Sequence, residues 1–176
     1  EPQYGAREAE SVARMVVCNR LKYDLSQLVA RYDEPCDIAD LEALVGELRA
    51  GRPVQYVLGV AEFCDMEFEV AEGVLIPRPE TEELVYHIVE TTKRGARILD
   101  IGTGSGCIAI ALKQRCPIWQ IRGVDISSDA LEVAKKNALH NQVDIIWEEM
   151  DILSKKPEST DIIVSNPPYI CHQEKE

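Results

Sequence analysis

The chain has 176 residues, enough for one domain of ordinary size together with a small second one. Hydrophobic residues make up 45% and charged residues 28%, a balance that is typical of a globular protein and excludes a disordered chain. Acidic residues outnumber basic ones by 31 to 19, and the net charge of -12 disfavours a nucleic acid as the main partner.

Neither the apolar runs nor the cysteines indicate a membrane or an exported protein. The longest apolar stretches, such as Cys107–Leu112, are too short to cross a bilayer, and no signal peptide is visible at the start. The cysteines are scattered, and no pair has the two-residue spacing of a zinc or redox motif. We therefore expect a cytoplasmic protein with reduced thiols, no membrane contact and no bound metal.

The first part of the chain is predicted to be a small helical domain, residues 1–51. Apolar residues recur at helical spacing over residues 6–21 and again over residues 38–48. Asp37 or Asp40 stands where it could cap the second helix, and Gly51 and Pro53 follow its end.

A β-hairpin linker is predicted next, over residues 52–78. From Cys64 to Val70, apolar residues alternate strictly with acidic ones, which indicates a strand with one buried face. Residues 71–73 can turn the chain, so residues 74–76 are expected to form the partner strand.

Strands and helices alternate over the third part of the chain, residues 79–176. The strands are expected at residues 97–101, 120–125, 143–148 and 161–165, and the helices at 107–115, at 128–140 and before Gly95. This alternation predicts an α/β fold with a Rossmann-like parallel sheet and helices on both faces. Ligands of such sheets bind beyond the carboxyl ends of the strands.

A glycine-rich loop joins the first of these strands to the next helix. It reads Asp100-Ile101-Gly102-Thr103-Gly104-Ser105-Gly106, and its glycines let the backbone turn sharply and approach a ligand closely. Cys107 stands where a dinucleotide fingerprint needs glycine or alanine, and the Lys-Ser/Thr end of a nucleoside triphosphate loop is missing. The spacing resembles the first motif of class I S-adenosylmethionine-dependent methyltransferases; a plain strand-to-helix turn is the alternative.

Acidic residues follow the next two predicted strands. A carboxylate at Asp125 can accept both hydroxyls of a ribose, a role that we favour over a helix cap or a solvated acid. Asp151 stands where class I methyltransferases often place a group near the adenine amine, and a surface carboxylate is the alternative. The resemblance implies S-adenosylmethionine as cofactor and S-adenosylhomocysteine as product, bound by Gly102, Thr103, Gly104, Ser105, Gly106, Asp125 and Asp151.

The sequence Asn166-Pro167-Pro168-Tyr169 follows the last predicted strand and indicates which kind of reaction the protein catalyses. Neither proline has an N–H, so this stiff segment offers hydrogen-bond acceptors at the strand end. The side-chain oxygen of Asn166 and the carbonyl of Pro167 could hold both protons of a substrate NH2 group, and Tyr169 could pack against it. Fixing and aiming a weakly nucleophilic amide nitrogen would favour methyl transfer without a metal, a covalent intermediate or a strong base. A simple loop stop is the alternative.

Two further stretches indicate which nitrogen is methylated. Arg52-Pro53-Val54-Gln55-Tyr56-Val57-Leu58-Gly59, followed by Glu62-Phe63, and Ile76-Pro77-Arg78-Pro79-Glu80-Thr81-Glu82 resemble the release-factor glutamine methyltransferase family. The order of a helical domain, a hairpin linker and a methyltransferase domain is similar too. The resemblance covers nearly all of the chain from about Arg7.

This resemblance implies methylation of the glutamine in the Gly-Gly-Gln loop of peptide chain release factors, with no direct DNA partner. It implies that Asn166, Pro167, Pro168 and Tyr169 bind the substrate, that Asn166, Pro167 and Tyr169 form the catalytic set, and that Asn166 also lies at the cofactor. The same tetrapeptide serves in methyltransferases that act on adenine and guanine amines, so a nucleic acid amine methyltransferase is the alternative enzyme. A non-catalytic cofactor-binding module is a third interpretation.

The sequence departs from the family pattern in length. A class I methyltransferase sheet has seven strands, whereas four are predicted here. The missing strands would contribute one wall of the substrate pocket and would cover an apolar sheet edge. We therefore expect these residues alone to have little or no activity.

Overall fold

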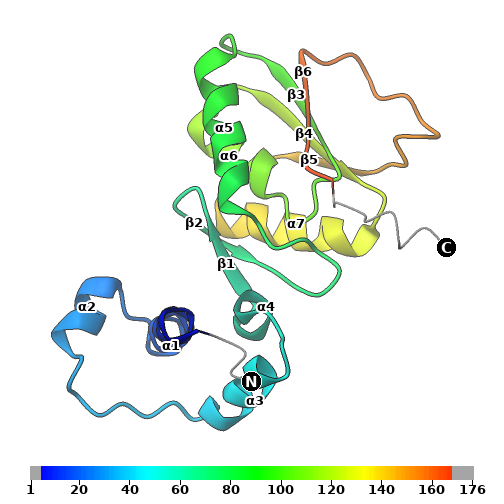
Figure 1. The fold of residues 1–176 in the computed structure, drawn as a ribbon. Helices are drawn as coiled ribbons and strands as arrows, with labels where there is room; N and C mark the ends of the chain where they lie inside the picture. The colour runs from blue at the N-terminus through cyan, green and yellow to red at the C-terminus, as the bar shows by residue number, and fades with distance from the viewer. Residues whose placement is uncertain (1–4, 168–176) are drawn as a thin grey trace. The chain divides into compact units, whose positions relative to one another are not determined.

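The structure, a computed structural model, describes residues 5–167, and the chain divides into two compact units between Gly59 and Val60 (Figure 1). The sequence had placed the first boundary after residue 51. The structure extends the first unit to Gly59, because a short helix, α4 (Val54–Leu58), contacts the two longer helices of that unit. The rest of the predicted hairpin linker, residues 60–78, belongs to the second unit.

The first unit is helical, as predicted. Its helices are α1 (Ala6–Leu21), α2 (Leu25–Ala30), α3 (Leu41–Arg49) and α4. Its small core consists of Val16, Leu44, Leu48 and Val54. Helix α2 was not predicted; it begins at a capping box in which Asp24 and Gln27 bind each other's backbone N–H groups. Asp40 precedes α3 but does not cap it with its side chain; its carboxylate lies 3.0 Å from the Arg20 guanidinium.

The hairpin forms, but the predicted partner strand is wrong. Strand β2 (Met66–Glu69) pairs antiparallel with the preceding segment, β1 (Val60–Phe63), and residues 74–76 form no strand. The two turn residues, Cys64 and Asp65, both have positive φ angles, 52° and 63°, as the tightest hairpin turns require. The turn predicted at residues 71–73 does exist, closed by a hydrogen bond from the Val74 N–H to the Ala71 carbonyl.

The second unit contains the predicted parallel sheet, with the strand order β5-β4-β3-β6 (Figure 1). Its strands are β3 (Arg97–Ile101), β4 (Gln120–Asp125), β5 (Ile146–Glu149) and β6 (Ile162–Ser165), and its helices are α5 (Pro79–Thr91), α6 (Cys107–Arg115) and α7 (Ser128–His140). Strand β5 begins later than predicted, because Val143 instead donates its N–H to the Ala138 carbonyl and closes the end of α7.

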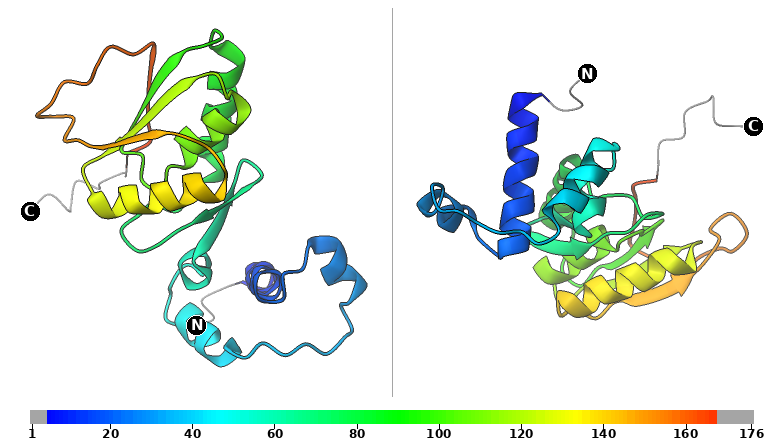
Figure 2. Two further views of the ribbon diagram at one scale, coloured as in Figure 1. Left: turned by 180° about the vertical axis from the view of Figure 1, so that it is seen from behind. Right: turned by 90° about the horizontal axis from the view of Figure 1, so that it is seen from below.

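The helices α5, α6 and α7 pack on one face of this sheet, which corrects the prediction of helices on both faces (Figures 1 and 2). The strands β3, β4 and β5 follow one another in one direction across the sheet, and right-handed connections therefore place α6 and α7 on the same face. The connection that crosses back from β5 to β6 contains no helix. The opposite face leaves apolar side chains such as Ile146 and Ile163 exposed.

The core of the second unit lies between the sheet and these helices. Ile98 from β3, Ile121 from β4 and Val164 from β6 pack there against Val85 and Ile110. Over the described residues, no helix combines the length and the apolar character that crossing a membrane would require.

Candidate functional site

The glycine-rich loop, residues 102–106, connects β3 to α6 and has the sharp backbone that the sequence predicts. Gly102, Gly104 and Gly106 have φ angles of 66°, 56° and 79°, which side chains rarely adopt. The N–H groups of Gly102 and Thr103 both donate to the Val124 carbonyl, at 2.9 and 3.0 Å, and so fasten the loop to β4. Apart from the neighbouring residues of the loop, no atom of residues 5–167 lies within 4 Å of the position that a side chain of Gly102 would occupy, so a ligand can approach the backbone there.

Side chains that pack against the glycine-rich loop hold it in place. A side chain at Gly106 would meet the Trp147 ring at 2.9 Å and Ala134 at 3.1 Å, and one at Gly123 would overlap the same ring. Trp147 therefore lies flat against β4 and the start of α6 only because both positions are glycine. Asn137, 1% exposed, donates to the Ser105 carbonyl at 3.0 Å and joins the loop to the hairpin through the backbone of Glu69.

Asp100, the last acid before the loop, is buried with 1% of its surface exposed. The Thr103 hydroxyl donates to its Oδ2 at 2.6 Å, while Oδ1 accepts no hydrogen bond of normal geometry from the described residues. Burial raises the pKa of Asp100 from its ordinary 3.8 to about 6, because the charged form is poorly solvated. A cation bound near the loop would relieve this cost.

Asp125 ends β4 beside the loop, as predicted. Its carboxylate accepts the N–H of Gly104 at 2.9 Å through Oδ2 and the N–H of Ser127 at 3.0 Å through Oδ1. Each carboxylate oxygen can accept a further hydrogen bond, and the side chain is only partly buried. Helix α7 is capped by Ser127 rather than by Asp125, since Ser127 Oγ accepts the Ala130 N–H.

Asp151 follows β5 and is exposed. Its Oδ1 accepts the Leu153 N–H at 2.9 Å, and its carbonyl accepts the N–H groups of Ser154 and Lys155. The side chain therefore stabilises a local turn, which is close to the surface role that the sequence analysis kept as the alternative.

Asn166 follows β6, and the structure brings it to the same sheet edge as the glycine loop. Strands β3 and β6 are paired so that Ile101 lies opposite Ser165, and each is followed directly by a site residue. The Ser165 hydroxyl donates to the Ile101 carbonyl at 2.8 Å and ties the two strand ends together. Pro167 is exposed, and the predicted residues Pro168 and Tyr169 lie outside the described residues.

The start of α5 contributes two side chains whose roles the sequence analysis did not identify. Thr81, 8% exposed, accepts a hydrogen bond of 2.9 Å from Asn166 Nδ2 through its hydroxyl oxygen. Glu82 Oε1 accepts the N–H of Cys64 at 2.9 Å, in the hairpin turn. The only sequence signal for these contacts was the Ile76–Glu82 stretch that carried the family resemblance.

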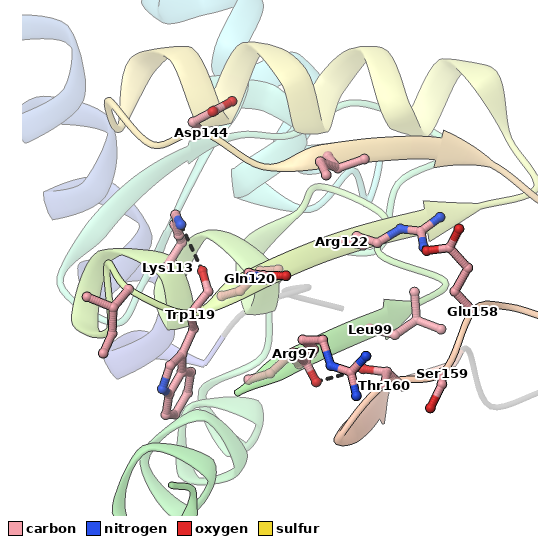
Figure 3. A pocket seen from close by; sticks show the side chains of 14 residues that line it. Arg97, Leu99, Lys113, Trp119, Gln120, Arg122, Asp144, Glu158, Ser159 and Thr160 are labelled. Carbon is pink, nitrogen blue, oxygen red and sulfur yellow. Dashed lines mark hydrogen bonds and ion pairs between the residues drawn. The ribbon is translucent and has the colours of Figure 1, made fainter. Parts of the chain in front are cut away.

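A cavity of about 680 Å³ in the second unit lies away from these residues. It is at the amino ends of β3 and β4 (Figure 3). Several of the charged side chains that line it already have partners. Arg122 pairs with Glu158 and Glu148, and Lys113 donates to the carbonyls of Pro117 and Trp119. None of the predicted site residues lines it.

The residues at the carboxyl edge fit S-adenosylmethionine. Its sulfonium and ammonium groups are cationic, and the loop offers the buried carboxylate of Asp100 next to open backbone at Gly102. Asp125 supplies acceptors for a ribose. Within residues 5–167, no cluster of three or more His, Cys, Asp or Glu side chains is arranged to hold a metal.

The sheet and the helices on its face form the class I methyltransferase fold. A tRNA (uracil-54, C5)-methyltransferase from Pyrococcus abyssi, solved with S-adenosyl-L-homocysteine, has a similar fold, with a TM-score of 0.52 and 22% identity. The match covers 62% of this chain and 28% of that one.

Sequence comparison identifies the family. Residues 79–176 match the methyltransferase small domain, and residues 3–59 match the PrmC N-terminal domain. The chain belongs to the methyltransferase small domain family.

Its relatives confirm the resemblance that the sequence motifs indicated. A release factor glutamine methyltransferase from Bacteroides thetaiotaomicron is 40% identical over 98% of this chain and 64% of its own length. Another, from Lactococcus lactis, is 52% identical over 72% of this chain and 47% of its own length. The chain thus spans about half to two thirds of the length of these relatives.

Proposed function

We propose that the full-length protein transfers a methyl group from S-adenosylmethionine to the side-chain amide nitrogen of the glutamine in the Gly-Gly-Gln loop of peptide chain release factors. The observation that carries this proposal is the position of Asn166 and Pro167 at the end of β6, beside the glycine loop at the end of β3. The names of the relatives support the choice of substrate.

The cofactor would supply a methyl group bound to a positively charged sulfur. Residues 102–106 would bind its amino acid part, Asp125 its ribose hydroxyls, and Asp151 its adenine amine. Asp125 is suited to this role because backbone N–H groups fix both of its carboxylate oxygens, and each oxygen can still accept a further hydrogen bond.

The substrate amide would be held by acceptors alone. The Asn166 side-chain oxygen and the Pro167 carbonyl would each accept one proton of the glutamine NH2 group, and Pro168 and Tyr169 would complete the pocket. Holding both protons fixes the plane of the amide and favours the positive charge that develops on nitrogen during transfer. After transfer, the excess proton leaves to solvent.

The release factor is a better partner than a nucleic acid, because the net charge of -12 repels phosphates. The reaction would take place in the cytoplasm, which agrees with the free thiols of Cys18, Cys36, Cys64, Cys107 and Cys116.

Mass analysis of a release factor tests this function directly. After incubation with the full-length enzyme and S-adenosylmethionine, we expect one added methyl group on the glutamine of the Gly-Gly-Gln loop. Total RNA and DNA, incubated in parallel with labelled cofactor, should remain unlabelled. Label in the nucleic acids, with none in the release factor, would overturn the proposal.

The variant Asn166→Ala tests the residue that carries the proposal. We expect methyl transfer to fall by about a thousandfold, the upper range for removing one group that stabilises a transition state. Binding of S-adenosylhomocysteine should stay within a few-fold. Asn141→Ala is a matched control, because within residues 5–167 the side-chain amide of Asn141 binds the Glu67 and Asn137 carbonyls and no predicted site residue, and it should transfer methyl at nearly the normal rate.

A further inference from the structure

The two ends of the Asn166 side-chain amide are chemically opposite. Oδ1 accepts hydrogen bonds, whereas Nδ2 only donates them. If the proposed function is correct, on which this inference rests, only Oδ1 can hold a proton of the substrate NH2 group. An amide rotated by 180° would present Nδ2 and its protons to another NH2 group, and the substrate would be repelled. The reaction therefore needs one orientation of this amide.

In the structure, the first turn of α5 provides a hydrogen-bond partner for the amide in this orientation. Asn166 Nδ2 donates to Thr81 Oγ1 at 2.9 Å, although the two residues are 85 positions apart in the chain. Because the amide is planar, directing its nitrogen at Thr81 directs its oxygen away from Thr81.

Thr81 is itself held firmly in place. Its side chain is buried, and its backbone N–H donates to the Arg78 carbonyl at 2.9 Å. The next residue, Glu82, binds the hairpin turn through the Cys64 N–H, so the start of α5 is anchored on that side as well. Pro79 begins the helix with a φ angle that is already helical. The hydroxyl oxygen thus occupies a fixed position relative to the end of β6.

We propose that Thr81 is a positioning residue for methyl transfer, which orients the Asn166 amide so that Oδ1 accepts a proton of the substrate NH2 group. Thr81 touches neither the substrate nor the cofactor in this role. It acts through Asn166, and its loss should affect the transfer rate far more than the stability of the fold.

Replacing Thr81 with valine tests this role, because valine keeps the shape and removes the hydroxyl. In the full-length enzyme, Thr81→Val should lower kcat for release factor methylation about five- to tenfold, the range expected for one lost hydrogen bond. The dissociation constant of S-adenosylhomocysteine should not change. Thr81→Ser keeps the hydroxyl and should restore kcat to within about twofold of the unchanged enzyme.

Thr91→Val is the matched control, since it makes the same substitution on the same helix. The Thr91 hydroxyl donates to the His87 carbonyl, one turn back in the same helix, and this variant should keep its full kcat. A second control combines Thr81→Val with Asn166→Ala. If Thr81 acts only through Asn166, the double variant is no slower than Asn166→Ala alone.

The side-chain amide signals of Asn166 in an NMR spectrum report the contact without any reaction. They are assigned by their absence in Asn166→Ala, and they should move in Thr81→Val and not in Thr91→Val. Unmoved signals, or a Thr81→Val enzyme with full kcat, would overturn the inference. A release factor left unmethylated by the unchanged enzyme would instead overturn the proposed function, and the NMR result would still decide whether Thr81 orients the amide.

Discussion

The two ends of the same parallel strands differ in how their polar groups are used. At the carboxyl ends, Asp100, Asp125 and Asn166 are held in place by hydroxyl or backbone partners and still have capacity to bind something else. At the amino ends, the cavity in Figure 3 is large, but it is lined by charged groups of which Arg122 and Glu158 pair with each other and Lys113 binds backbone carbonyls. Volume alone therefore does not mark the candidate site.

Two acids near the carboxyl ends of these strands, Asp100 in β3 and Glu148 in β5, differ in their pKa shifts. Burial raises the pKa of Asp100 to about 6, whereas hydrogen bonds from Lys155 and then Arg122 lower the pKa of Glu148. The charged form of Asp100 therefore destabilises the folded protein without a ligand, whereas the charged form of Glu148 stabilises the folded protein. A protein retains a costly buried carboxylate more readily where a ligand needs it.

The largest effect that would separate the two ends concerns cofactor binding. Asp125→Ala removes the proposed ribose acceptor and the partner of two backbone N–H groups, so the affinity for S-adenosylhomocysteine should fall about a hundredfold. Asp151→Ala should lower it only a few-fold, because that side chain is exposed. Isothermal titration calorimetry measures both. Equal, negligible losses would show that this edge does not bind the cofactor.

A somewhat smaller effect is expected on the pH dependence of stability. Between pH 4 and 6 the folded state holds a proton on Asp100 that the unfolded state releases, so stability should fall as the pH rises through this window. The shift of about two units corresponds to about 3 kcal/mol. Denaturant unfolding of Asp100→Asn should therefore show a gain over the unchanged protein that grows from pH 4 to pH 7.

Glu148→Gln should change the stability in the opposite direction to Asp100→Asn. Because the folded pKa of Glu148 is lowered, its stabilising contribution is present above the unfolded pKa and is lost as the pH falls. The gap between this variant and the unchanged protein should widen as the pH rises, with the variant less stable. A gain for Glu148→Gln at neutral pH would mean that the two acids do not differ as described.

Packing beneath the glycine loop predicts a loss of stability of about 1–3 kcal/mol for Gly123→Ala, because the new methyl group overlaps the Trp147 ring. Gly46→Ala in α3 is the control: nothing lies within 4 Å of the new methyl group, and alanine favours a helix by about 0.5–1 kcal/mol. Thermal unfolding should move in opposite directions for the two variants. If Gly123→Ala is neutral, Trp147 does not support the loop.

The sequence predicted the carboxyl edge of the sheet better than the segments that support it. The alternation of strands and helices gave β3, β4, α6 and α7 their observed bounds, because each is a long, regular, apolar element. The hairpin was paired with the wrong partner because Cys64 and Asp65 form its tight turn, where glycine or asparagine is the usual signal.

The contacts that position the site residues could not be read from the sequence. The hydrogen bond between Thr81 and Asn166 joins an N-terminal helical turn to a strand end far along the chain, and no local pattern encodes such a contact. The bond between Glu82 and the Cys64 N–H depends on the same arrangement. Local propensity fixes elements, whereas the orientation of one amide depends on how those elements pack.

The smallest expected effect tests the amino end of the strands. Glu158 is 85% exposed, and its partner Arg122 also binds Glu148, so Glu158→Gln should change stability by less than about 0.5 kcal/mol. Cofactor affinity and methyl transfer should be unchanged, because none of the predicted site residues lines this cavity. A marked loss of cofactor affinity in this variant would mean that the ligand occupies the cavity, and that paired charges at the amino ends can bind it after all.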